Sequence, residues 1–215
     1  PLHMPDYLGC CWSLDQNVGR IRAQLEVLGL AENTVVIYTS DHGSHFCTRN
    51  SEYKRSCHEA SIRVPFIATG PGFTGGKVVN ELVSLIDLPA TFLAAGGIDV
   101  PSHDRGRPVQ PLVAGKAKDW QDDVFMQISE SQVGRAIRTK RWKYCVHAPG
   151  LNSSENPGSD TYEEQYLYDL ESDPHERNNR VMDAGLADIR KELADRLVRR
   201  MIHAGESKTT SKPPS

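Results

Sequence analysis

The sequence predicts an α/β protein: a central, mostly parallel sheet flanked by helices, followed by a small C-terminal antiparallel sheet with a packed helix. The first observation is a short, β-branched apolar run at residues 35–39, which is typical of a buried parallel strand. The second is the helical spacing of apolar residues over positions 6–30, directly before that run. The third is the alternation of residues 135–146, which favours an antiparallel hairpin.

Composition narrows the class of protein. The chain has 215 residues, 38% hydrophobic and 25% charged, as in one ordinary globular domain or a large part of one. A net charge of −3 gives no basic excess of the kind that nucleic-acid-binding proteins carry. No apolar run approaches the roughly 18 residues that a membrane span needs. We therefore expect neither a nucleic-acid partner nor a membrane span, and the sequence leaves the oligomeric state open.

The first predicted elements are a helix and two neighbouring strands. Gly29 and Asn33 are suitable stop signals for the helix, in which we expect Cys10 and Cys11 to be small buried side chains. The second strand covers residues 64–69, with a proline that marks its first residues. A further helix is predicted over residues 87–95, with Asp87 as its N-cap and a Gly-Gly pair closing it.

The residue pattern in the C-terminal third of the sequence predicts the smaller sheet. Its strands are expected within residues 124–146, with the hairpin turn near 139–141, and at 166–170 after a polar surface loop at 148–165. An Asp-Pro pair at 173–174 predicts a helix start, and a last amphipathic helix follows. Alternation predicts one solvated basic face on the hairpin, formed by Arg135, Arg138, Lys140, Arg141 and Lys143.

Three divisions of the chain follow from these elements. Residues 1–120 are expected to form part of an α/β core, and residues 121–206 the smaller C-terminal subdomain. Residues 207–215 are polar and end in Pro and Ser, which predicts a disordered tail. The opening residues 1–5 lack the order of a signal peptide, so we expect a start within a longer protein.

A cluster of functional residue types follows the first strand. Asp41 and His42 come directly after it, where ligands of open α/β sheets bind, and they offer oxygen and nitrogen donors to a metal. The same residues also suit a helix cap and a buried, hydrogen-bonded histidine. The loop behind them is rich in groups that bind anions, including His45, Arg49, Lys54 and His58. Metal donors followed by a cationic loop indicate chemistry on an anionic ester.

Several motifs together resemble the type I sulfatases, the formylglycine-dependent branch of the alkaline phosphatase-like superfamily. The resemblance covers nearly the whole chain, which is similar to the C-terminal portion of such enzymes. Among them, bacterial polysaccharide sulfatases are the most similar. The motifs that carry it are Thr39-Ser40-Asp41-His42-Gly43, Lys54, Glu59-Ala60-Ser61-Ile62-Arg63-Val64-Pro65-Phe66-Ile67, Val83-Ser84-Leu85-Ile86-Asp87 and Leu167-Tyr168-Asp169-Leu170.

The resemblance implies roles for individual residues. It implies that Asp41 and His42 bind a divalent ion, usually calcium, and that Lys54 contacts the sulfate group. Many sulfatases have an amide side chain at the position of His42. Histidine stands there in relatives that act on phosphonate or choline esters. Loop position makes His45, Arg49 and His58 candidate substrate contacts. Glu59 and Arg63 are expected to brace the loop as an ion pair, leaving catalysis to the other residues.

The family's nucleophile motif, C/S-x-P/A-x-R, is absent from this sequence. None of the five cysteines has the required neighbours, although Cys47 and Cys57 flank the cationic loop and can be imagined as a pair. We therefore expect a fragment that lacks the N-terminal half and its formylglycine, and that is inactive alone. The resemblance implies a periplasmic or secreted sulfuric ester hydrolase acting on a sulfated carbohydrate. Alternatives are a phosphate or phosphonate ester hydrolase and a non-catalytic remnant that binds sulfated glycans.

Overall fold

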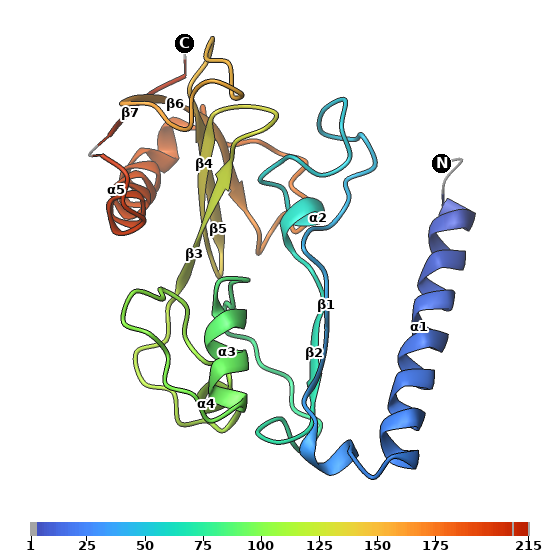
Figure 1. Ribbon diagram of the computed structural model, residues 1–215. Helices are drawn as coiled ribbons and strands as arrows, with labels where there is room; N and C mark the ends of the chain where they lie inside the picture. The colour runs from blue at the N-terminus through green and yellow to red at the C-terminus, as the bar shows by residue number, and fades with distance from the viewer. Residues whose placement is uncertain (1–3, 208, 215) are drawn as a thin grey trace. The chain divides into compact units, whose positions relative to one another are not determined.

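The computed structural model describes residues 4–207 and 209–214, and the chain forms two compact units (Figure 1). The first unit comprises the chain up to residue 39 with residues 66–79 and 86–117. The second comprises residues 40–65, 80–85 and the chain from residue 118 onward. The cationic loop thus belongs to the C-terminal unit, whereas the sequence had grouped it with residues 1–120.

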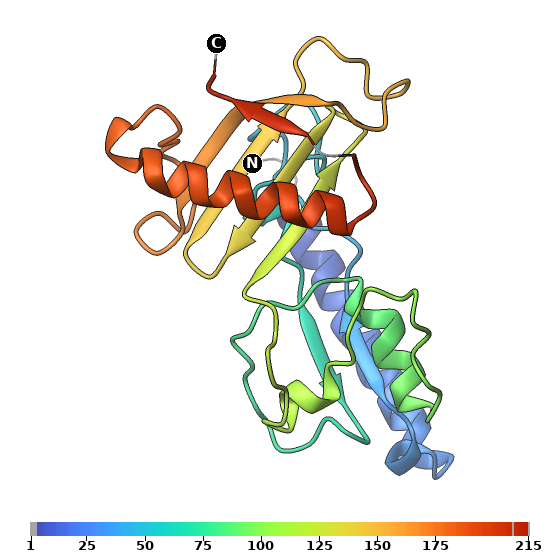
Figure 2. The same ribbon diagram turned by 90° about the vertical axis from the view of Figure 1, so that its left-hand side faces the viewer.

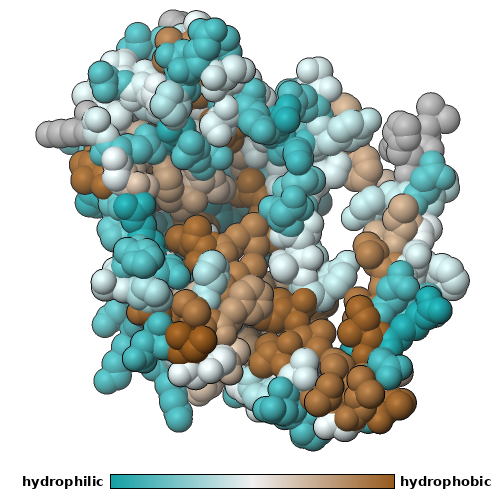
Figure 3. All heavy atoms as spheres, in the orientation of Figure 1, coloured by the Kyte–Doolittle hydropathy of each residue, from teal (hydrophilic) through white to brown (hydrophobic). Residues whose placement is uncertain are grey.

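The first unit begins with helix α1, Met4–Val27, which the apolar spacing predicted, and a short 3-10 turn, Ala31–Asn33. None of the residues of α1 is buried in the described part of the chain, and Trp12 is 67% exposed. Figure 3 shows hydrophobic residues at the surface near the C-terminal end of this helix. The expected burial of Cys10 and Cys11 is therefore wrong, because no described element covers the apolar stripe that holds them.

Strands β1, Val36–Thr39, and β2, Phe66–Thr69, are neighbours as predicted, but they run antiparallel. The prediction of a mostly parallel sheet had not specified the direction of this pair. A parallel pair needs a crossover that returns the chain to the same end of the sheet, whereas the loop after β1 leads back into β2 from the end where β1 stops. The only helix in that loop is α2, Glu59–Ile62, which is a single turn.

Two helices complete the first unit. Helix α3, Asp87–Ala95, has the predicted bounds, but its N-cap is Ile86 and not Asp87. The buried Asp87 carboxylate instead accepts a hydrogen bond from the backbone N–H of Arg107, at 2.9 Å. A short helix α4, Gln110–Val113, follows. Helix α3 thus ties its first turn to the loop before α4.

The second unit is built on a five-stranded sheet. The strands lie in chain order and neighbours are antiparallel, except for the last pair, which is parallel. This confirms the predicted small antiparallel sheet. The strands are β3, Asp123–Ile128, β4, Gly134–Thr139, β5, Trp142–His147, β6, Thr161–Asp169, and β7, Thr210–Lys212.

The ends of this sheet differ from the prediction. Strand β6 begins within the expected surface loop, at Thr161. Strand β7 lies in the predicted disordered tail, so that prediction is wrong for residues 210–212; residues 208 and 215 lie outside the described residues. The exposed edge of β6 provides backbone partners for β7, and the Lys212 ammonium adds an ion pair to Glu163 at 3.2 Å.

The last helix packs across one face of the sheet, as predicted. Helix α5, Ala187–His203, crosses that face in Figure 2. Its residues Leu193, Leu197 and Met201 share a buried core with Tyr144 and Leu167 of the sheet. No helix within residues 4–207 and 209–214 is long and apolar enough to cross a membrane.

Two sequence expectations in the second unit are wrong. The Asp-Pro pair at 173–174 starts a turn and not a helix, because the Asp173 carboxylate accepts backbone hydrogen bonds from Arg177 and Asn178. The hairpin's basic face is not uniformly solvated: Arg135 is 2% and Lys143 0% exposed. Each has a carboxylate partner from a distant segment, Glu206 for Arg135 and Glu59 with Glu176 for Lys143.

Candidate functional site

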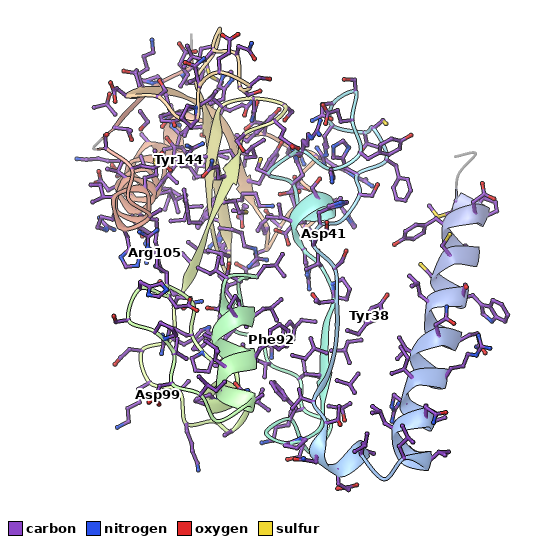
Figure 4. All side chains as sticks on the ribbon, in the orientation of Figure 1. Tyr38, Asp41, Phe92, Asp99, Arg105 and Tyr144 are labelled. Atoms are coloured by element: carbon purple, nitrogen blue, oxygen red, sulfur yellow. The ribbon has the colours of Figure 1, made fainter. Side chains whose placement is uncertain are left out.

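The start of the loop of residues 40–65 contacts its end at Gly43. The Gly43 N–H donates to the Ser61 carbonyl at 2.8 Å, and a Cβ atom at Gly43 would lie 2.1 Å from the Ala60 carbonyl oxygen. Only glycine permits this approach. The contact holds the segment with Asp41 and His42 against helix α2, and Figure 4 marks Asp41 where the loop begins.

Asp41, His42 and Lys54 converge in this loop. The Nδ1 atom of His42 lies 2.8 Å from the Gly43 carbonyl oxygen, which can only accept, so Nδ1 carries the proton and donates. The Nε2 atom is then an acceptor in the neutral ring, and the Lys54 ammonium donates to it at 2.9 Å. The Asp41 Oδ2 atom is 3.5 Å from the same nitrogen.

This arrangement fits part of a metal site. The side chains of Asp41 and His42 are 83% and 41% exposed, and they direct one carboxylate and one imidazole lone pair to a common region. A hard cation such as calcium takes about six to eight oxygen ligands, so these two donors can contribute to a site but not complete it. No cluster of three or more His, Cys, Asp or Glu side chains able to hold a metal occurs among the described residues.

His58 lies in the interior of the unit. Its Nδ1 atom is 2.5 Å from the Ser56 hydroxyl, and its Nε2 atom is 3.1 Å from the Tyr168 hydroxyl. Burial, with the nearby positive charge of Arg49, lowers the pKa of His58 to about 3. The ring is therefore neutral at pH 7 with both nitrogens engaged, so it anchors the loop to β6 and offers no free nitrogen to a substrate.

Arg49 is a second anchor. Its guanidinium donates to the backbone carbonyls of His175 and Glu176, at 2.7 and 2.8 Å. These bonds join the cationic loop to the turn that follows β6. The arginine predicted to contact substrate is thus engaged in fixing the loop.

His45 is the third predicted contact, and its surroundings differ from those of the other two. It is 2% exposed, and neither ring nitrogen has a hydrogen-bond partner among the described residues. Burial is the main cause that lowers the pKa of His45. A neutral imidazole always carries one N–H, so His45 retains a donor without a protein acceptor.

The sequence analysis did not predict the ion-pair network that lies beneath the loop. Glu59 pairs with Lys143 at 2.8 Å and with Arg138 at 3.3 Å, and not with Arg63 as expected. Burial opposes ionisation of Glu59, but Lys143 and then Arg138 hold the pKa of its carboxyl below the usual value. The Glu176 carboxylate accepts from the Glu59 backbone N–H at 2.8 Å and also contacts Lys143.

One signal for this network was present in the sequence. Once the turn is placed at residues 139–141, Arg138 and Lys143 become directly opposed residues of the hairpin. Like charges in that position are destabilising unless a carboxylate lies between them. The opposed pair therefore indicated an acidic partner from elsewhere in the chain, although not which one.

The comparisons with known proteins show the family to which the chain belongs. A family model described as N-sulphoglucosamine sulphohydrolase, C-terminal, matches residues 51–203, and a model described as Sulfatase matches residues 3–98. The chain belongs to the sulfatase family, and over most of its length to that C-terminal family. This confirms the resemblance on which the site residues were chosen.

Three similar proteins show the extent of the match. Arylsulfatase K of Homo sapiens is 32% identical over 80% of this chain and 32% of its own length. An N-acetylglucosamine-6-O-sulfatase of Bacteroides thetaiotaomicron is 30% identical over 89% of this chain and 34% of its own. A solved structure in complex with its substrate D-glucosamine-2-N,6-O-disulfate has a TM-score of 0.77 and 27% identity, covering 94% of this chain and 41% of that one. The chain thus spans about a third of the length of these curated relatives.

Proposed function

We propose that the full-length protein is a sulfuric ester hydrolase that acts on a sulfated carbohydrate, and that this chain supplies one side of its active site. The observation that carries the proposal is the convergence of Asp41, His42 and Lys54 on the exposed part of one anchored loop. A carboxylate, an imidazole lone pair and an ammonium group together suit an anionic ester with a bound cation.

Each of these residues has a definite task in that reaction. Sulfate transfer places negative charge on the nonbridging oxygens, which the Lys54 ammonium can bind as a fixed hydrogen-bond donor. The Gly43 carbonyl fixes the His42 tautomer, so that the lone pair of Nε2 can bind a cation. The Lys54 ammonium, which donates to Nε2 in this structure, can then turn toward the substrate. A divalent ion, which we propose to be calcium, would supply Lewis acidity when bound beside Asp41 and His42.

The remaining parts of the reaction lie outside this sequence. No C/S-x-P/A-x-R motif occurs in it, so the proposed formylglycine nucleophile belongs to an N-terminal part of the protein. With two metal donors and no nucleophile, the isolated chain is expected to have no sulfatase activity. The proposed location of the whole enzyme is periplasmic or secreted.

The proposed substrate is a polysaccharide with sulfated glucosamine units. Support comes from the printed descriptions of the matched family, of the B. thetaiotaomicron relative and of the structure bound to a glucosamine disulfate. A phosphate or phosphonate ester is the second candidate, because an imidazole stands at position 42 where many sulfatases have an amide.

The experiment assays the full-length protein with a sulfated glucosamine oligosaccharide and with a phosphonate monoester. We expect release of sulfate to dominate, and Lys54→Ala to lower its turnover about 10²-fold or more, the scale for losing one fixed oxyanion donor. Lys140→Ala, which removes an exposed lysine from the hairpin turn, is the matched control. Dominant phosphonate cleavage would favour the second candidate, and absence of both activities would favour a glycan-binding remnant.

A further inference from the structure

Two buried cysteines from distant segments meet beneath the cationic loop. Cys57 lies just before α2 and Cys145 lies in β5; each is 1% exposed. Both belong to a small core cluster with Ile128 and Ala136, on the face of the sheet opposite to α5. The family match assigns no role to either thiol.

The register of the sheet places Cys145 on the face that the loop covers. Cys145 is directly paired with Ala136 of β4 and Tyr166 of β6, and directly paired residues project to the same face. The ring of His58 packs on that face, with its centroid 5.0 Å from that of Tyr166 and 5.5 Å from that of Tyr168. Because Cys57 immediately precedes His58, the packing of His58 brings Cys57 into the same buried cluster as Cys145.

Both thiols are free in the structure, and they lie buried in the same small core cluster. Burial, together with the hydrogen bond from Cys57, raises the pKa of the Cys145 thiol well above its usual value. The loop is also anchored on both sides of Cys57, by Arg49 to the turn after β6 and by Glu59 to Lys143 of β5. The fold therefore keeps the two cysteines in one buried cluster.

The other cysteines lack such an arrangement. Cys10 and Cys11 are exposed on α1, and Cys47 is exposed within the loop. The pairing of Cys47 with Cys57 considered from the sequence is not found, since one thiol faces solvent and the other is buried.

We propose that Cys57 and Cys145 form an intramolecular disulfide bond that ties the loop of Asp41, His42 and Lys54 to strand β5. The oxidant is a disulfide donor such as oxidised glutathione. The Cys57 thiolate attacks the donor and releases one donor thiol; the Cys145 thiolate then attacks the sulfur of Cys57 and releases the second. Two protein thiols and one donor disulfide become one protein disulfide and two donor thiols.

Burial determines when this exchange happens. Thiolates react and thiols do not, and both groups are closed off from solvent in the folded unit. The bond should therefore form during folding, before the loop packs, and react slowly in a protein that has already folded reduced. This inference does not depend on the proposed hydrolysis, because it concerns only the fate of two thiols.

The test follows the two cysteines in the full-length protein. The protein is unfolded and reduced, refolded in a mixture of oxidised and reduced glutathione, then alkylated in denaturant and digested. We expect the peptides containing Cys57 and Cys145 to be joined, while the Cys47 peptide is alkylated. Recovery of Cys57 and Cys145 as alkylated thiols, or of Cys57 joined to another cysteine, would overturn the proposal.

A stability measurement separates this bond from any other disulfide. Reduction of the oxidised protein should lower the Tm of the second unit by roughly 5–10 °C, since the bond closes a long loop in the unfolded chain. Cys57→Ser should abolish that difference, and Cys47→Ser, which changes an exposed thiol of the same loop, should keep it. A difference that persists in Cys57→Ser would contradict the assignment.

Discussion

The two units of the chain differ in how their residues are buried. In the C-terminal unit, α5 covers one face of the sheet, and Tyr144, Leu167 and Leu197 are each at most 2% exposed. In the first unit, no residue of α1 is buried, and Ile67 of β2 is 64% exposed. The site loop follows a strand of the first unit but takes its anchors, Arg49 and His58, from the second. The site is therefore positioned by the C-terminal sheet.

The largest expected effect comes from breaking the buried ion-pair network. Lys143→Ala leaves Glu59 and Glu176 as buried carboxylates with one partner fewer, and we expect it to lower the free energy of unfolding by about 3–5 kcal/mol. Urea denaturation of the C-terminal unit measures this change. Lys140→Ala, three residues before Lys143 in the exposed turn between β4 and β5, should leave stability unaltered. Equal loss in both variants would show that the network contributes nothing specific.

A core truncation compares the two units directly. Leu197→Ala removes a side chain that is 2% exposed, and we expect a loss of about 2–5 kcal/mol in the free energy of unfolding. Ile21→Ala in α1, where the side chain is 58% exposed, should cost less than about 0.5 kcal/mol in this chain. Matching losses in the two variants, measured by urea denaturation, would mean that α1 is buried in solution.

Acid should weaken the anchoring of the loop. The pKa of His58 is about 3 in the folded unit, because burial disfavours its charged form, against about 6.5 in an unfolded chain. The unfolded state therefore binds more protons between these values, so stability is full above pH 6.5 and falls as pH decreases toward 3. His58 alone changes the free energy of unfolding by at most about 1.4 kcal/mol per pH unit. His58→Gln should flatten the acid limb of the stability profile; an unchanged slope would remove His58 from the interior.

Sequence patterns captured what depends on neighbouring residues. The hairpin of β4 and β5 and the helix α5 have the expected periods, because alternation and the helical repeat are local properties of the chain. The direction of β2 against β1 was not accessible in this way, since it depends on how residues 40–65 return. The partners of Lys143 were missed for the same reason: Glu59 and Glu176 reach it from distant segments.

The site shows the same limit at the level of single side chains. The motif spacing grouped Asp41, His42 and Lys54, and in the structure His42 Nε2 lies 3.5 Å from Asp41 Oδ2 and 2.9 Å from Lys54 Nζ. It could not separate the exposed His42 from the buried His58 and His45, because a polar loop has no repeat that tells inside from outside. Only the contacts with Tyr168 and with the turn after β6 reveal which residues are anchors.

Calcium binding tests the central claim most directly, namely that Asp41 and His42 form the metal side of a site with Lys54. Calorimetric titration of calcium into the full-length protein should show binding that Asp41→Ala weakens strongly, because a carboxylate ligand is lost. His42→Asn should be tolerated better, since an amide oxygen also suits calcium. The isolated chain, with two of the required ligands, should bind calcium only weakly. Equal calcium affinity with and without the Asp41 carboxylate would contradict the account.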